Sequence, residues 1–317
     1  MEILKNPNYD FLGKAKYFIP ASLAVIAAGL FLIGTRGLRS GVEFSGGTQI
    51  IAKFKETPAI DRIRAAVEKV APGSLIQSYG ETGRNQVLVR LAAVPENAPA
   101  EGELDTSARK ALDALAADYP QNPVLEHSAE IVGPVVGAEL RQKAIWLTVF
   151  GLLFQLVYIT VRFGGGIWGA AAVIACFHDV LFCLAFLCFF GYEITLNVIA
   201  ALLTLVGYSV NDTIVIFDRV RENLKQKRKE PLRKILNDSV NQTLTRTLIS
   251  NGTTFLAVLG LYLFGGEVLA GFGFTMVVGI VVGTYSTIYI AGPIVAWWSE
   301  RNRGRGGASL GAAKAAL

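Results

Sequence analysis

The stretch GYSVNDTIVIF, residues 207–217, decides the fold because it places one carboxylate, that of Asp212, in an apolar run over residues 194–217. A run of roughly 20 apolar residues is long enough to cross the hydrocarbon core as a helix. An ionised Asp costs roughly 2.5 to 3.5 kcal/mol at the centre of such a helix, so these residues face the bundle interior and mark ion or proton pathways. The stretch therefore predicts a membrane helix with a functional acid.

The rest of the chain is equally apolar. Of its 317 residues, 52% are hydrophobic and 17% charged, which is too apolar for a soluble protein of this size. The first apolar run follows Lys14 and Lys16 and lacks a small-residue cleavage site, so we interpret residues 1–35 as a cytoplasmic N-terminus and an uncleaved anchor. We predict a polytopic α-helical membrane protein with six transmembrane helices. The first spans 17–35, and the other five lie within 144–300, at 144–162, 167–190, 194–217, 247–265 and 269–298.

Basic residues mark one side of the membrane. The segment 218–246 holds nine basic and four acidic residues, and the tail after residue 301 adds more basic residues. By the positive-inside rule, the N-terminus, a basic loop near 218–246 and the tail 301–317 are cytoplasmic, so the protein is multi-pass in the cytoplasmic (inner) membrane. The Gly-, Ala- and Arg-rich tail is predicted to be disordered. Basicity thus encodes topology and does not indicate binding to nucleic acid.

Residues 36–143 form the predicted extracytoplasmic domain. Asp105 and Thr106 are expected to cap its second helix, and residues 94–102 lack any period, which predicts an exposed loop. The expected elements are a strand at 42–55, a helix at 59–70, strands at 75–79 and 86–91, a helix at 106–118 and a strand at 124–132. This βαββαβ order predicts one α+β ferredoxin-like domain between the first and second helices.

Polar residues line one face of the fourth span and one face of the fifth. Asp212 lies near the cytoplasmic end of its span and Arg246 enters the next span from that side, so the two can meet at similar depth. From spacing alone, Arg246 either pairs with Asp212 or extends to the headgroups, and such a pair is either functional or a structural salt bridge. The predicted polar seam consists of Asn197, Thr204, Tyr208 and Asn211 on the fourth span and Ser250 and Thr254 on the fifth.

His178 and Asp179 add two titratable groups to the third span. Neighbours on one helix point about 100° apart, so we expect that they do not pair with each other. Either they form a proton relay with Asp212, or they are packing residues satisfied elsewhere in the bundle.

Other chemistries find little support in the sequence. All three cysteines lie in the third span and only two histidines are present, so neither a disulfide framework nor a metal site is expected. Gly164–Gly166 lacks the Lys of a phosphate-binding loop, and no nucleophile and base can be paired, so we expect no cofactor and no enzyme activity. Gly46 and Gly47 interrupt a strand pattern, which indicates a bulge or a close backbone approach. Gly279 and Gly283 give the sixth span a smooth face for close helix packing.

Four motifs in order resemble the SecF family of protein-export membrane subunits. GYSVNDTIVIFDRVREN at 207–223 is similar to the signature of that family, and EFSGGT at 43–48 resembles its Asp-Phe-x-Gly-Gly-Thr element. IVGPVVG at 131–137 and SVNQTLTRT at 239–247 resemble its elements before the second and fifth helices. Glu43 stands where the family has Asp, which leaves the role of that carboxylate open.

The resemblance implies half of a resistance-nodulation-division transporter that pairs with a homologous SecD subunit and assists the Sec translocation channel. In such proteins the proton-motive force moves the outside domains, which promotes translocation and release of unfolded exported polypeptides; the bundle itself is surrounded by membrane lipids. Asp212 and Arg246 match the membrane charges of the family. Two alternatives remain at this point: an exporter half for lipids or small molecules, and a passive scaffold of the Sec channel.

Overall fold

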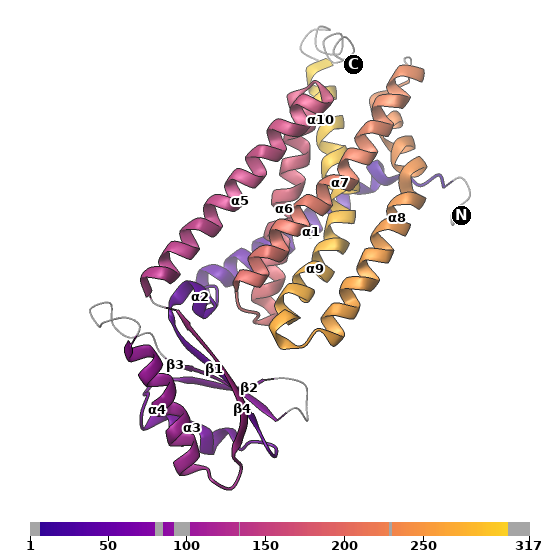
Figure 1. Cartoon of the computed structure of the whole chain (residues 1–317). Coiled ribbons are helices and arrows are strands. Elements are labelled where there is room, and N and C mark those ends of the chain that lie inside the picture. Colours follow the sequence, from indigo (N-terminus) through magenta and orange to yellow (C-terminus); the bar gives the residue numbers. More distant parts are fainter. Residues whose placement is uncertain (1–6, 80–84, 92–101, 133, 228–229, 304–317) are drawn as a thin grey trace.

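A single helix bundle carries a small sheet domain at one end (Figure 1). The computed structural model describes residues 7–79, 85–91, 102–132, 134–227 and 230–303. Within these ranges six segments are long and apolar enough to cross a membrane, which confirms the prediction of a multi-pass helical membrane protein. They are α1 (Phe11–Arg36), α5 (Pro134–Phe163), α6 (Gly166–Phe190), α7 (Leu196–Gln226), α8 (Leu232–Phe264), and α9 (Glu267–Ser286), which continues through the π-helical turn η1 (Thr287–Ala291) into α10 (Gly292–Arg303).

Helices α7 and α8 extend well past the expected spans and form a polar hairpin. The expected basic loop near 218–246 is largely helical, because α7 continues to Gln226 and α8 already begins at Leu232. Asn223 donates to Ser239 Oγ at 2.8 Å, and Arg219 donates to Gln242 at 2.6 Å. Hydropathy misses this hairpin because polar side chains, rather than an apolar run, hold its helices together.

The hairpin also binds the start of the chain. The side-chain oxygens of Asn241 and Asn237 accept hydrogen bonds from the backbone N–H groups of Tyr9 and Phe11, each at 2.9 Å. The start of α1 and the end of α10 therefore lie at the same end of the bundle, opposite the sheet domain (Figure 1).

The sheet domain has four antiparallel strands in the order β2-β3-β1-β4. Helices α3 and α4 cover one face of the sheet (Figure 1), and alternate residues of β1 such as Ile50, Ala52 and Phe54 are buried beneath them. Its elements are β1 (Gly47–Phe54), α3 (Ile60–Glu68), β2 (Leu75–Tyr79), β3 (Gln86–Leu91), α4 (Gly102–Asp118) and β4 (Val124–Val132). The expected order of strands and helices is therefore observed.

Two expected boundaries in this domain are wrong. The strand expected at 42–55 begins only at Gly47, because Val42–Ser45 forms the helical turn α2, which ends where Gly46 adopts a φ of 71°. Helix α4 begins at Gly102, one turn before the expected cap at Asp105 and Thr106. The expected loop at 94–102, up to residue 101, and the tail after Arg303 lie outside the described residues.

Helix α9 packs closely on α7, as its glycines predict. A Cβ at Gly279 would lie 2.7 Å from both methyl carbons of Leu205, and one at Gly283 would lie 3.3 Å from Ser209 Cβ. The approach of these two backbones positions the polar side chains of the site described next.

Candidate functional site

Asp212 is buried between three helices. Its side chain leaves α7 and is only 4% exposed. Asn251, on α8, donates its side-chain N–H to Asp212 Oδ2. The same amide donates to Thr284 Oγ1 on α9, and its oxygen accepts from the Tyr208 hydroxyl at 2.8 Å. One amide therefore connects the carboxylate to α7, α8 and α9.

Arg246 does not make the direct ion pair considered as one possibility. It interacts with Asp212 electrostatically, yet among the described residues no nitrogen of Arg246 lies within 4.0 Å of a carboxylate oxygen. The reason is the helix face: Arg246 and Ser250 are exposed, whereas Thr247 and Asn251, one position further along, are buried. The Asn251 amide, and not the Arg246 guanidinium, is the group that donates directly to Asp212.

Asn251 is the functional residue that the sequence reasoning missed. It lies in the apolar run 247–265, so the cost argument that singles out Asp212 applies to a buried amide as well. The regular spacing of Arg246, Ser250 and Thr254 instead predicts a polar seam on the neighbouring face of the helix.

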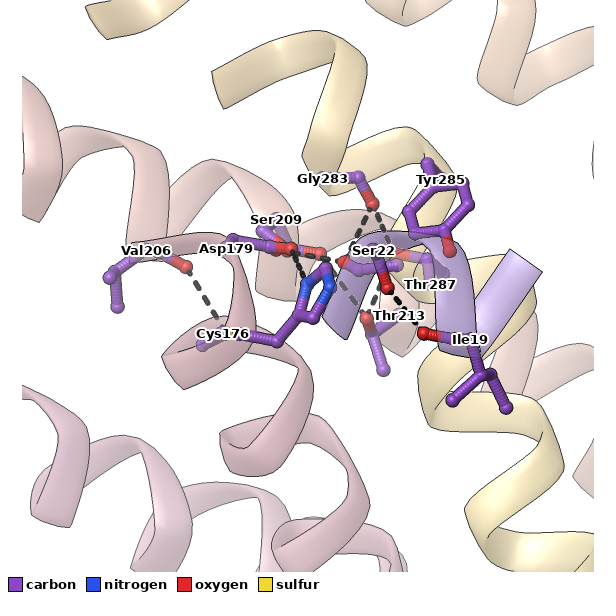
Figure 2. Close-up of polar contacts among 12 residues, drawn as sticks. Ile19, Ser22, Cys176, Asp179, Val206, Ser209, Thr213, Gly283, Tyr285 and Thr287 are labelled. Atoms are coloured by element: carbon purple, nitrogen blue, oxygen red, sulfur yellow. Dashed lines mark hydrogen bonds and ion pairs between the residues drawn. The ribbon is translucent and has the colours of Figure 1, made fainter. Parts of the chain in front are cut away.

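A second cluster surrounds Asp179, which is fully buried on α6 (Figure 2). Its Oδ2 accepts hydrogen bonds from Ser209 Oγ of α7 at 2.6 Å and from Ser286 Oγ of α9 at 2.8 Å. Close by, the hydroxyls of Thr213 and Thr287 are 3.2 Å apart. This cluster joins α6, α7 and the start of the π-helical turn η1.

His178 and Asp179 do pair, contrary to expectation. His178 Nδ1 lies 3.1 Å from Asp179 Oδ1. Although the two Cα–Cβ bonds diverge, rotation about the side-chain bonds brings the ring edge round to the carboxylate. His178 Nε2 is buried and has no hydrogen-bond partner in the described part of the chain.

The two carboxylates are bound on neighbouring faces of α7. Ser209 of α7 donates to Asp179, while Tyr208 and Asp212 of that helix bind Asn251. The described residues contain no direct hydrogen bond between the clusters, so the link between Asp179 and Asp212 in the described residues is the shared packing of α7 and α9 and not a chain of hydrogen bonds.

The rest of the predicted polar seam divides into inner and outer residues. Asn197 donates to the Val268 carbonyl at 3.2 Å, and Thr254 donates to the Ser250 carbonyl within α8 at 3.1 Å. Thr204 and Asn211 are exposed, as Arg246 is.

Residues 42–47, which contain α2 and the glycine pair Gly46-Gly47, form the joint between the helix bundle and the sheet domain. Glu43 Oε1 accepts the backbone N–H of Leu196, the first residue of α7, at 3.4 Å. Gly46 and Gly47 have φ values of 71° and 120°, which side chains rarely tolerate. Burial and then the charge of Glu43 raise the pKa of Glu130 on β4.

Family models match most of the chain. Residues 113–301 match the model described as protein export membrane protein SecD/SecF, C-terminal, and residues 31–58 match the SecD/SecF GG motif. Within the described residues no group of three His, Cys, Asp or Glu side chains could hold a metal ion.

Curated relatives and solved structures agree with these models. The chain is 36% identical to the protein translocase subunit SecF of Koribacter versatilis, over 98% of this chain and 96% of that protein. It is 42% identical to SecF of Calditerrivibrio nitroreducens over 93% of this chain and 96% of that protein. It is similar to SecDF of Thermus thermophilus, described as a translocon-associated membrane protein, with a TM-score of 0.81 and 34% identity over 93% of this chain and 39% of that chain. A super-membrane-facing form of SecDF matches with a TM-score of 0.69 and 33% identity, over 95% of this chain and 40% of that chain.

Proposed function

This chain belongs to the SecF family of protein translocase subunits, and from that premise we propose that it works with a SecD partner to couple the proton-motive force to protein export. Membership makes the chain a transport component rather than an enzyme. It spans about two fifths of the SecDF chain it resembles, 39% by length, so the remaining part is assigned to SecD. The observation that carries the coupling proposal is the buried Asp212 and its amide partner.

Proton binding at Asp212 would reverse a hydrogen bond. The charged carboxylate only accepts, and Asn251 donates to it. A protonated carboxyl gains an O–H donor. With that proton on Oδ2, the amide turns its oxygen toward Asp212 and its N–H groups toward Tyr208. Since Asn251 also binds Thr284, that rotation changes the contacts of three helices and gives the bundle two alternative packings. Arg246 adds a positive charge near Asp212.

The available energy is sufficient for such a switch. One proton crossing 100 mV releases about 2.3 kcal/mol, enough to shift a two-state equilibrium about fiftyfold. We assign Asp179 and His178 to the same machinery as a second titratable pair, because they contact the same two helices, α7 and α9, from the α6 side.

The test is Asp212→Asn in proteoliposomes that contain the SecD partner and the Sec channel. Asn resembles the protonated acid in shape and carries no charge, so gradient-stimulated export should fall to the level seen without a gradient. The control is Asp218→Asn on the same helix, where Asp218 pairs with Arg162 at 3.3 Å and both side chains are 42% exposed. We expect that variant to keep wild-type stimulation.

Wild-type stimulation in Asp212→Asn would sink the coupling proposal and leave the passive scaffold as the better description. A lipid or small-molecule exporter would predict that purified protein fails to retain the SecD partner and the Sec channel.

Exposed polar side chains support the partner assignment. Thr204, Asn211, Arg246 and Ser250 are exposed on α7 and α8 although both helices cross the membrane. Polar groups in lipid are costly unless another protein surface or water satisfies them. We propose that SecD covers this face.

We further propose the orientation and domain type expected from the sequence. The basic α7–α8 hairpin and both chain ends would lie in the cytoplasm, and the sheet domain would lie outside, where unfolded exported polypeptide emerges. The strand order β2-β3-β1-β4, with both helices on one face, supports the ferredoxin-like assignment. Lipids would surround the exposed apolar face of helices such as α5.

A further inference from the structure

Two separate parts of the chain converge on the short α6–α7 loop. The linker before α2 binds it through the backbone: Ile194 N–H donates to the Arg39 carbonyl at 2.7 Å, and Gly41 N–H donates to the Ile194 carbonyl at 2.8 Å. The sheet domain reaches the same loop through Arg90 of β3, whose Nη2 donates to Glu193 Oε2. Both side chains of this ion pair are largely buried, at 17% and 21% exposed.

The linker and the sheet are separated by the glycine pair. On the bundle side, α2 lies against α5 so closely that a Cβ at Gly137 would be 3.1 Å from the backbone nitrogen of Gly46. On the other side, β1 begins at Gly47. Because Gly46 and Gly47 both have positive φ, a backbone bend fixed by no side chain separates the sheet from α2.

Arg90 therefore has a distinct position in the molecule. The Arg90–Glu193 ion pair joins the sheet domain directly to the helix bundle. Arg90 also donates to Gln49 Oε1 of β1 at 3.3 Å, which fixes its side chain to the sheet. Its Nε is buried and has no partner among the described atoms, so Arg90 is held through its outer guanidinium nitrogen.

The α6–α7 loop, which Arg90 binds through Glu193, leads directly into α7, the helix that contains Asp212. Thr195 caps α7 by accepting the N–H of Val198 at 3.3 Å, two residues after Glu193. Glu43 places a second acceptor, with its negative charge, at the same helix start. If the sheet domain moves relative to the bundle, these contacts therefore move the N-terminal end of α7.

We propose that Arg90 and Glu193 are positioning residues that couple the orientation of the sheet domain to α7, with Gly46-Gly47 as the pivot. This inference deepens the proposed function and rests on it. The ion pair carries force between the domain outside the membrane and the helix that bears the titratable acid, so breaking it uncouples the proton gradient from export while both parts stay folded.

The experiment is a charge swap in proteoliposomes containing the SecD partner and the Sec channel. We compare Arg90→Glu, Glu193→Arg and the double variant, and measure export with and without a proton gradient. Each single reversal should lower the gradient-stimulated component about fivefold or more, the lower end of typical coupling between sites. The double variant should recover most of it, and export without a gradient should be unchanged in all three.

The matched control is Lys53→Glu. Lys53 pairs with Glu126 at 3.2 Å across β1 and β4, within the sheet domain and with exposed side chains. Reversing this charge disturbs an ion pair of the same type without touching the bundle, so gradient-stimulated export should stay at the wild-type level.

Two outcomes would overturn the inference: Arg90→Glu with full stimulation, or a double variant as impaired as the single reversals. Asp212→Asn in the same assay separates the two proposals. If it abolishes stimulation while Arg90→Glu retains it, the joint is wrong and the coupling function stands. If Asp212→Asn itself retains stimulation, the coupling function fails.

Discussion

Asn251 satisfies three polar groups at once, on Asp212, Tyr208 and Thr284. An apolar side chain of similar size would remove the donor to the Asp212 carboxylate and one hydrogen bond each from Tyr208 and Thr284. Leaving a buried polar group unpaired costs about 1 to 3 kcal/mol, and more for a charged one. At the scale of single residues, the amide therefore matters to the site as much as the acid does.

Asn251→Leu should accordingly reduce gradient-stimulated export as strongly as Asp212→Asn. The expected cause is that the carboxylate loses its donor and the link between α7, α8 and α9 is broken. Thr253→Val is the control on the same helix, because Thr253 is exposed and its hydroxyl donates to the Ser250 carbonyl of that helix at 2.9 Å. Full stimulation in Asn251→Leu would show that Asp212 works without this amide.

Glu130 gives a second residue-scale prediction, in the pH dependence of stability. Burial and the charge of Glu43 raise its pKa above the ordinary value of 4.5, so the folded chain binds more protons than the unfolded chain just above pH 4.5. Stability from this group is therefore lost as pH rises from 4.5 through the raised pKa, and stays lower at neutral pH.

Glu130→Gln removes this titration. The variant should gain thermal stability relative to wild type as pH rises through that window, measured as the difference in unfolding midpoint in detergent. Glu56→Gln, at an exposed position of the same domain, serves as the control. A Glu130→Gln difference that is constant with pH would contradict the assignment.

At the scale of helices, the small residues of α1 and α6 set how closely the bundle closes. A Cβ at Gly29 would lie 2.1 Å from Ala185 Cβ and 2.7 Å from its Cα, so a backbone, and not a flexible side chain, blocks it. A Cβ at Gly34, on the same helix, would meet no atom of another described element within 4 Å.

Gly29→Ala should therefore force α1 away from α6 and destabilise the protein by about 1 to 3 kcal/mol, the usual cost of overpacking. Gly34→Ala should leave stability unchanged or raise it slightly, since Ala favours the helix over Gly by roughly 1 kcal/mol. Thermal unfolding of both variants in the same detergent measures the difference. Equal midpoints would mean that this contact is not tight in the folded protein.

The helices also show where sequence patterns stop being informative. Apolar runs locate every span, and glycine spacing on α9 predicts its close approach to α7. The same patterns end α7 at residue 217 and begin α8 at 247, because the hairpin beyond the membrane is held by pairs such as Asn223 with Ser239. Polar contacts between distant residues leave no periodic signature in hydropathy.

At the scale of the whole molecule, the order of strands and helices outside the membrane follows from the sequence, while the joint does not. Turn residues and alternating patterns predict four of the six elements closely, whereas α4 begins one turn early and Val42–Ser45, predicted as strand, forms a helical turn. Its conformation depends on α5 and on the start of α7, which are distant in sequence. The ion pair of Arg90 with Glu193 links residues 103 positions apart and is likewise invisible to local patterns.

The hydrogen bonds from Tyr9 and Phe11 to the α7–α8 hairpin constrain the order in which the protein folds. Tyr9 finds its hydrogen-bond partner in Asn241, 232 residues later in the chain. During synthesis the first helix enters the bilayer long before that partner has left the ribosome. Helix α1 therefore remains without these contacts until α8 has been synthesised. Its final docking is a late step of biogenesis, although it is the first helix to enter the membrane.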